Sequence, residues 1–549
     1  MTDARPSSRL KRLAADRTLA TILCAASLLV VAGPVAMLTL HLAGMQQPAP
    51  TPGVFDPVLA EPPWRLLLRS LAWAAGVGVL STLVAIPAAW HARGRPAATL
   101  AFMVPLALPS YFAYGALNLL RAPGTPLGDW LVGLVDQGFP DAPMLAGRVI
   151  AALSLTLWTW PLAMLAMLPA ARGVSDDLLD QIEVDAPGPV QRALARVWLL
   201  GAAPWLAATL VGLVVLGSPV PLHVAQVPTA SMAVWIGLVQ DPANPRHWLA
   251  GWPLLVPALV AGMWMAMRLG PVADGGEAPS IARARPSTRI AAAAGVWWTL
   301  STLAPIALLA WHLHDWASIP RFLRIHRDSL EGSLLIAGAT GLASGFIACS
   351  FWWIAPRAWR TDAWSRRAVA VAVAAWCAAT LAPGVMLGAG FAHLARLAPF
   401  DALADSIAVP VAAHVVRYAS PCILAAMLML RAESRATADS LRLDGADTLR
   451  GFAATRLRAG AGPLVACMLL TASLSLHDID TSILVQPPGD TMLAQHLLGY
   501  LHFWRTEELS AGSLILMAAS LVAAGTAAWL LRGAAGVMQP ARPGAGTSR

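Results

Sequence analysis

Lysine is nearly absent from this chain, because only Lys11 among its 38 basic residues is a lysine. A phosphate-binding loop of the GxxxxGK[ST] kind needs a lysine directly after a glycine-rich turn, whereas Lys11 lies in the segment SRLKRL. The sequence therefore excludes this kind of ATP site within the chain. Any work driven by ATP would need a separate partner protein.

Charged residues of either sign are also scarce. They make up 12% of the 549 residues, while 57% are hydrophobic. Soluble domains carry about 25% charged residues, so the composition excludes an ordinary soluble protein. The arginines are spread over short segments between apolar runs, which argues against nucleic acid as a partner.

The few cysteines and histidines show no spacing typical of a disulfide framework, a metal site or a haem. All five cysteines lie within apolar runs: Cys24, Cys349, Cys377, Cys422 and Cys467. We therefore predict no cofactor and no metal site. His312, His314 and His326 are candidates for contact with a metal cargo, although histidines at a membrane interface more often have no such role.

Long apolar runs dominate the rest of the chain, and each is long enough to cross about 30 Å of hydrocarbon as a helix. The first is about twice as long as the apolar core of a signal peptide, so we expect an uncleaved first helix. We predict an all-α polytopic membrane protein with about twelve helices in the lipid bilayer. The expected ranges are 18–42, 68–91, 98–120, 148–170, 199–222, 250–269, 290–312, 329–354, 368–396, 408–431, 463–485 and 508–532.

Basic residues predict the orientation, because cytoplasmic loops of membrane proteins carry an excess of arginine and lysine. With the N-terminus in the cytoplasm, 27 basic residues lie inside and ten outside, and Arg417 lies within a helix. The ratio predicts that both termini are cytoplasmic.

The two halves of the sequence repeat one another. A shift of 259 residues places Ser70 on Ser329, Asp185 on Asp444 and Pro204 on Pro463, and with a gap 106–120 aligns with 380–394. We predict a first six-helix half at 1–270, a cytoplasmic linker at 271–288 and a second half at 289–549. Two parallel copies imply a pseudo-twofold axis along the membrane normal, with a path between the halves.

Each predicted half contains one long polar segment on the cytoplasmic side. The second, 432–462, holds four acidic residues and six arginines if Arg431 at its edge is counted. Its apolar spacing predicts a pair of short amphipathic helices broken at Asp444–Gly445, with Asp444 capping the helix after the turn. The equivalent in the first half is 171–199. Segments of this length and charge indicate a docking surface, and a solvated loop without a partner is the alternative.

These two segments resemble the cytoplasmic loops of the permease subunits of bacterial ABC importers. That loop has the pattern EAA, three residues, Gly, nine residues, I-x-L-P, onto which Asp439-Ser440-Leu441 and Gly445 align in the second copy. In the first copy Asp180-Gln181-Ile182 aligns, with Ala186 at the glycine position. The resemblance implies that Asp180, Asp185, Ala186, Asp439, Asp444, Gly445 and Ala446 couple the chain to an ATPase.

The fused layout and the segment 482–503 look most like the iron(III)-type permeases, and thiamine permeases share that layout. The resemblance implies a type I importer fold in the bacterial inner membrane, with no enzymatic activity in this chain. It also implies two kinds of partner, namely two copies of a cytoplasmic ABC ATPase and a periplasmic solute-binding protein. Ferric iron is favoured by resemblance alone, and thiamine, polyamines and oxyanions stay open.

Four ionisable residues are expected at membrane depth: Arg417, His477, Asp478 and Asp480. Charged side chains in this environment usually face a partner or a water-filled path. We therefore hypothesise that Arg417 with Asp478 or Asp480 lines or gates a translocation path. The alternative interpretations are a structural ion pair or a helix that simply ends at Ser475.

Two other classes of function stay open. A secondary transporter driven by an ion gradient would need membrane-buried acids in both halves, and the charge-poor first half argues against it. A polytopic membrane enzyme would need an acidic or histidine pair at the membrane surface, for which the only candidate is the segment 477–480.

Overall fold

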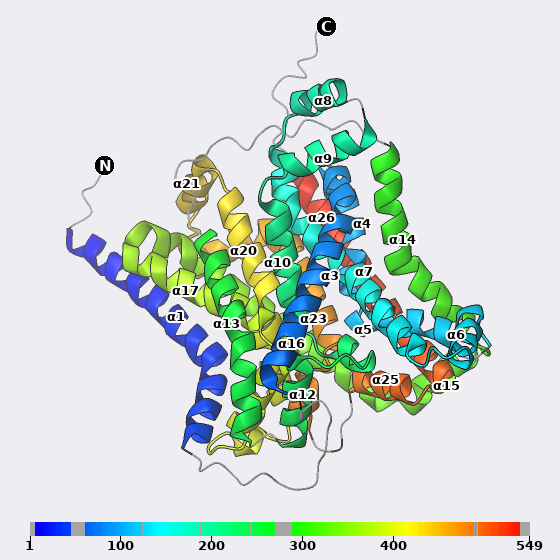
Figure 1. Ribbon diagram of the computed structural model, residues 1–549. Helices are drawn as coiled ribbons and strands as arrows, with labels where there is room; N and C mark the ends of the chain where they lie inside the picture. The colour runs from blue at the N-terminus through cyan, green and yellow to red at the C-terminus, as the bar shows by residue number, and fades with distance from the viewer. Residues whose placement is uncertain are drawn as a thin grey trace.

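The computed structural model describes residues 6–44, 61–122, 124–186, 188–241, 244–268, 288–487, 489 and 492–537. These residues form helices, with no strand among them. The predicted linker at 271–288 lies outside the described residues except for Thr288, which begins α14. Figure 1 shows the helices gathered in one bundle.

The described residues contain eight helices that are long and apolar enough to cross a membrane. Four bent pairs of shorter helices raise this number to twelve if each pair is one span. The chain is therefore an all-helical membrane protein with eight to twelve candidate spans. The long helices are α1 (Pro6–Ala43), α3 (Pro63–Ala92), α7 (Ala142–Gly173), α13 (Pro245–Arg268), α14 (Thr288–Trp311), α16 (Arg327–Thr361), the stretch Leu449–Leu476 that ends in α23 (Arg458–Leu476), and α26 (Thr506–Val537).

Several ranges expected as continuous helices are broken. The range 98–120 is divided into α4 (Pro96–Phe102), η1 (Val104–Ala107), α5 (Ser110–Asn118) and η2 (Leu119–Arg121), and 368–396 into α17 (Ala363–Leu381) and α18 (Gly384–Ala395). Bends of 70° and 108° separate the two parts of each pair. A proline follows each break. Leu108 before Pro109 and Ala382 before Pro383 each take an extended ψ of 152°. A proline forces this extended conformation on the residue before it.

The other broken ranges lie next to the polar loops. The range 408–431 is α19 (Ala408–Tyr418) and α20 (Ser420–Ala432), bent by 43°. The range 199–222 contains α10 (Ala203–Leu216), which meets α9 (Pro189–Leu199) at 75°, and α11 (Val220–Val224) follows it. The range 463–485 ends as a membrane helix at Leu476, and only the short α24 (Ser482–Val485) follows.

The first helix of each predicted half packs on helices from the other half. Helix α1 packs on α16, α17 and α18, whereas α14 packs on α3, α5 and α7. Helix α13 packs closely along α17 as well. The two parts of the chain are thus interleaved within one bundle (Figure 1).

One contact recurs with the same spacing in the two parts of the chain. The Ser70 hydroxyl of α3 accepts the first N–H of α12 (Ala230–Gln240) at 2.8 Å, and the Ser333 hydroxyl of α16 accepts the first N–H of α25 (Leu493–His502) at 3.0 Å. Each contact joins residues 160 apart in the sequence. These contacts relate Ser70 to Ser333. The 259-residue shift pairs Ser70 with Ser329 instead, one helical turn earlier.

Close helix packing also recurs. A Cβ atom on Gly78 of α3 would lie 2.4 Å from the Ala208 carbonyl oxygen, and one on Gly341 of α16 would lie 2.7 Å from the Met468 carbonyl oxygen. Only glycine allows the backbones to approach this closely. A glycine therefore allows the close packing of α3 on α10, and another glycine allows that of α16 on α23.

The bundle has two differently built ends (Figure 1). One carries the polar-loop helices α8 (Asp176–Asp185), α9 and α21 (Arg435–Leu443), and we refer to it as the loop end. The opposite end carries the short helices α6 (Pro126–Asp136), α12, α15 (Ser318–Ile325) and α25. The loop end therefore contains both segments that the sequence singles out.

Candidate functional site

The second polar loop is a helical hairpin with a sharp turn. Helix α21 ends at Leu443, and Gly445 takes a left-handed φ of 83°, a conformation that favours glycine. The next helix, α22 (Leu449–Phe452), begins after Thr448, whose hydroxyl accepts the Gly451 N–H at 3.0 Å. The break lies where the sequence predicts it, but the capping prediction for Asp444 is wrong, because Thr448 caps the helix instead.

The base of this loop is closed by a buried ion pair. Arg456, in the wide turn η4 (Ala453–Leu457), donates from Nε and Nη2 to the two carboxylate oxygens of Glu433 at 3.1 and 2.9 Å. The Arg456 side chain is 3% exposed and that of Glu433 15%. Burial raises the pKa of Glu433 above its ordinary value, although the Arg456 charge acts in the opposite direction. The two-pronged geometry fixes where the chain leaves α20 and where it returns toward α23.

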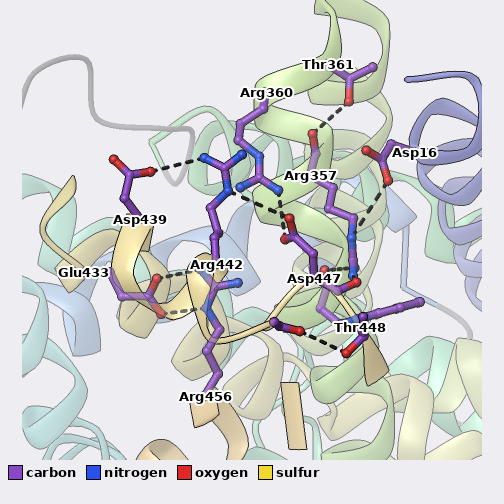
Figure 2. A network of polar contacts seen from close by, with 12 residues as sticks. Asp16, Arg357, Arg360, Thr361, Glu433, Asp439, Arg442, Asp447, Thr448 and Arg456 are labelled. Atoms are coloured by element: carbon purple, nitrogen blue, oxygen red, sulfur yellow. Dashed lines mark hydrogen bonds and ion pairs between the residues drawn. The ribbon is translucent and has the colours of Figure 1, made fainter. Parts of the chain in front are cut away.

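A network of arginines surrounds Asp447 in the turn (Figure 2). The Asp447 carboxylate accepts from Arg360 at 3.1 Å and lies 3.8 Å from Arg442, which also pairs with Asp439 at 3.2 Å. Its carbonyl accepts from the buried Arg357 of α16. Burial would raise the pKa of Asp447, but the Arg360 hydrogen bond and the surrounding arginine charges lower it below its ordinary value. The loop is thereby attached to the end of α16.

The tip of the second loop presents apolar side chains to its surroundings. Leu443 is 90% exposed and Leu449 66%. Ala446, which the resemblance assigns to coupling, is buried, whereas Asp439 and Asp444 are exposed. The loop therefore combines a fixed interior with a free apolar tip and charged sides.

Replacing Gly451 by alanine tests how tightly the turn is packed. A Cβ atom there would lie 1.9 Å from the Gly445 carbonyl oxygen, so the turn has to shift. We expect a local cost of about 1–3 kcal/mol, measured as faster amide exchange between residues 448 and 457. Gly499→Ala is the matched control, since no atom lies within 4 Å of its Cβ position in α25. An unchanged exchange pattern in Gly451→Ala would contradict this packing.

The first polar loop has the same kind of attachment in a different form. Arg93, which follows α3 and is 3% exposed, donates to the Val174 carbonyl and lies 3.0 Å from the Asp176 carboxylate. Helices α8 and α9 are linked by Arg196 and Glu183 at 3.3 Å and by Arg192, which donates to the Ala186 carbonyl. The loop is thus fixed to the end of α3.

The predicted residues of the first loop do not form a left-handed turn. Ala186 is extended, with φ −107° and ψ 94°, where Gly445 in the second loop has a positive φ. Asp180 and Asp185 are exposed, as is Val184 at 81%. The two loops thus share their attachment and their exposed apolar side chains, but they differ in how they turn.

A second group of predicted residues meets inside the bundle. Arg417 of α19 donates to the Asp478 carboxylate at 3.0 Å and to the Asp480 carboxylate at 3.1 Å. All three residues are buried. Arg417 also donates to Thr481 at 2.7 Å, and Asp478 accepts the Thr481 N–H at 3.1 Å. The structure therefore gathers one positive and two negative side chains in a single hydrogen-bonded cluster.

The cluster includes residues that sequence reasoning missed. His414, one helical turn before Arg417, contacts the hydroxyls of Ser475 and Ser482 at 2.7 and 2.9 Å and lies 3.5 Å from Asp478. The sequence feature that could have identified His414 is its three-residue spacing from Arg417, which places both side chains on one face of α19. His477 does not join the cluster, because its ring contacts the Ser520 hydroxyl of α26 at 2.9 Å.

The position that the 259-residue shift pairs with Arg417 carries no charge. Trp158 of α7, which aligns with Arg417, donates its indole N–H to the Leu108 carbonyl at 2.9 Å. A small cavity beside it is lined by Pro105, Phe112 and Pro305 among others. The two positions that the 259-residue shift pairs, Trp158 and Arg417, thus differ in charge.

The histidines considered for a metal cargo are not gathered into one site. His326 lies against His496, with ring centroids 4.7 Å apart, and contacts the Tyr500 hydroxyl at 2.7 Å. His312 contacts the Leu308 carbonyl of its own helix. Among the described residues, no group of three or more histidine, cysteine, aspartate or glutamate side chains has a geometry that would hold a metal ion.

Two features therefore stand out as candidate functional elements. One is the pair of arginine-anchored loops at the loop end, and the other is the buried cluster of Arg417, Asp478 and Asp480. No protein-family model, no curated protein and no solved structure matches this chain.

Proposed function

We propose that this chain is the fused permease subunit of an ATP-driven importer of the binding-cassette type. Two copies of a separate ATPase dock on the loops at 171–199 and 432–462. The single observation that carries this proposal is the construction of these loops, since each is attached to the end of a long membrane helix through a buried arginine. An exposed apolar tip held on a fixed base suits a surface that receives force from a partner.

The anchoring arginines supply the mechanical connection. Arg93 and Arg357 are buried, and each donates to a backbone carbonyl of its loop. Hydrogen bonds to a charged donor are stronger than neutral ones, and a buried unpaired partner is costly. A displacement of either loop therefore moves the end of α3 or α16 with it.

Recurring contacts support two duplicated halves. Beyond the serine and glycine pairs described above, the carbonyls of Ala107 and Leu381 precede the two proline breaks and face the other half. Ser473 of α23 donates to Ala107 at 3.1 Å, while the Cβ position of Gly217, after α10, lies 3.1 Å from the Leu381 carbonyl oxygen. In this proposal the solute path runs between these equivalent breaks.

In the proposed orientation the loop end faces the cytoplasm of a bacterium, and both termini lie there. The excess of arginine at this end supports that orientation. The short helices at the opposite end then face the periplasm, where a solute-binding protein delivers its cargo. Ferric iron is the proposed solute, favoured by the resemblance of segment 482–503.

The proposed cycle is mechanical. ATP binding closes the two ATPases, draws the loops together and rocks the halves between outward-open and inward-open states. The cluster of Arg417, Asp478 and Asp480 acts as a gate in the second half. Its position beside α18, which starts at a proline break, supports this role.

The test uses exposed residues at the loop tips that leave the anchors intact. In Val184→Asp and Leu443→Asp, we expect the amount of copurified ATPase to fall about tenfold, as a lost contact worth about 1.4 kcal/mol would produce. The matched control is Phe503→Asp, because Phe503 is 79% exposed at the opposite end. ATPase binding that is unchanged in both loop variants, or that falls equally in the control, would count against the proposal.

The competing function is a secondary transporter, for which the buried acids Asp478 and Asp480 are the specific observation. Membrane vesicles containing this chain alone distinguish the two functions. We expect no solute accumulation under a proton or sodium gradient without the ATPase. Accumulation under either gradient would favour the transporter.

A further inference from the structure

Helix α1 reaches the second polar loop through one buried arginine (Figure 2). Arg357 is 6% exposed and lies near the end of α16. Its Nη2 donates to the Asp447 carbonyl, its Nη1 donates to the Trp353 carbonyl, and its Nε lies 3.8 Å from a carboxylate oxygen of Asp16. A single guanidinium therefore joins α1, α16 and the loop.

The geometry at this junction requires arginine. The guanidinium is a planar fork with donors in fixed directions, and here three of its nitrogens face three different segments or turns. The Trp353 ring lies 4.0 Å from Cζ and supports the plane of the fork. A lysine at this position would keep the charge but could not hold the three directions together.

Further contacts fix α1 in place beside the junction. Arg17 lies 3.8 Å from Asp362, and the Trp364 indole donates to the Thr21 hydroxyl at 3.4 Å. Farther along α1, the buried Trp376 indole donates to Ser27 at 3.1 Å. The helix is thus attached to the start and the middle of α17.

The far part of α1 packs along α18, the short helix next to the buried charge cluster. The rings of His41 and His393 lie 4.6 Å apart. Gly384, the first residue of α18, lies directly against the Arg417 guanidinium. One continuous helix therefore contacts both the second loop junction and the helix that borders the cluster.

The first half lacks this connection among the described residues. The contacts of Arg93 are with Val174 and Asp176, both from its own loop. Arg93 therefore attaches its loop to α3 alone, whereas Arg357 adds the N-terminal helix.

We propose that Arg357 is a positioning residue. Its pairing with Asp16 makes α1 move together with loop 432–462 and with α16. This inference rests on the proposed function, in which the ATPase moves that loop. Helix α1 then carries the displacement of the loop to α18, and the second half is coupled to ATP through two helices instead of one.

The experiment measures amide hydrogen exchange on the full chain in lipid nanodiscs. Asp16→Asn keeps the size of the side chain and removes its charge. Since a partly exposed ion pair is worth roughly 1 kcal/mol, we expect about fivefold faster exchange at residues 444–452. Exchange in the first loop, at residues 176–186, stays unchanged. Unchanged exchange at 444–452 overturns the proposal.

Three further variants separate positioning from a general loss of structure. Asp16→Glu restores the carboxylate and is expected to restore slow exchange. Arg357→Lys keeps the charge without the fork and is expected to behave like Asp16→Asn or worse. Asp328→Asn is the matched control, since it removes an exposed acid at the other end of α16. Equal effects in Asp16→Asn and Asp328→Asn overturn the proposal.

A second measurement distinguishes this inference from the proposed function. Where the ATPase copurifies, stimulation of its hydrolysis by the solute-binding protein is expected to fall about fivefold in Asp16→Asn and to recover in Asp16→Glu. If amide exchange in the loop is faster but no variant binds an ATPase, the contact between Asp16 and Arg357 is supported and the proposed function is overturned. An altered loop with unaltered stimulation of the bound ATPase overturns the role of α1 in coupling.

Discussion

Arg417→Gln is expected to lower the free energy of unfolding by about 3–5 kcal/mol, because removing one partner of a buried ion pair leaves an uncompensated charge. Here two carboxylates, Asp478 and Asp480, would remain buried beside the substituted side chain. We expect a clear fall in the temperature at which the purified chain loses its monodisperse state in detergent. Arg396→Gln is the control, since Arg396 is exposed after α18, and its effect should be within about 0.5 kcal/mol.

The triple variant Arg417→Met, Asp478→Asn, Asp480→Asn separates stability from gating. Replacing all partners of a buried ionic group by neutral side chains is often close to neutral for stability. We therefore expect most of the lost stability to return. If the cluster gates the path, solute uptake stays impaired in this stable variant. Normal folding together with normal uptake in Arg417→Gln would dismiss the gating role.

Glu433→Gln is the second change with a large expected effect. It leaves the nearly buried Arg456 without its carboxylate, and we expect a cost of about 3–5 kcal/mol, confined largely to the loop. The measurement is amide exchange at 433–457 together with thermal unfolding. Because the loop base opens, copurified ATPase should fall as well if the loop is its docking surface.

Two variants control this second prediction. Glu331→Gln removes the acid of an exposed pair with Arg327, in which both side chains are at least 60% exposed, and such pairs contribute little. Glu433→Gln combined with Arg456→Met removes both partners, so the losses should not add. Additive losses would show that Glu433 and Arg456 act independently, contrary to the geometry.

Composition and hydropathy were sufficient to predict the membrane class and the positions of most helices. The sequence could not show which predicted spans are bent. Pro109 and Pro383 end helices at the extended residue before them, whereas Pro34 and Pro87 lie inside continuous helices. The difference depends on which neighbouring groups satisfy the freed backbone, and those neighbours are distant in the sequence.

The site was predictable only in part for a similar reason. Asp478 and Asp480 were candidates because charge inside an apolar run is rare, and the structure brings both to Arg417. The anchors Arg93 and Arg357 were missed, since in the sequence they look like ordinary basic residues at the end of a predicted helix. Only the burial of their side chains and the backbone carbonyls that they meet distinguish them.

The interleaved packing of α1 and α14 has a consequence for how the molecule is made. Helix α1 is synthesised long before its neighbours α16 to α18, so it stays in the bilayer without its final packing partners until they are made. Helix α14, by contrast, finds α3, α5 and α7 already synthesised. Assembly should therefore finish late and from the C-terminal side, and a chain cut between the halves should yield two fragments that mature only when produced together.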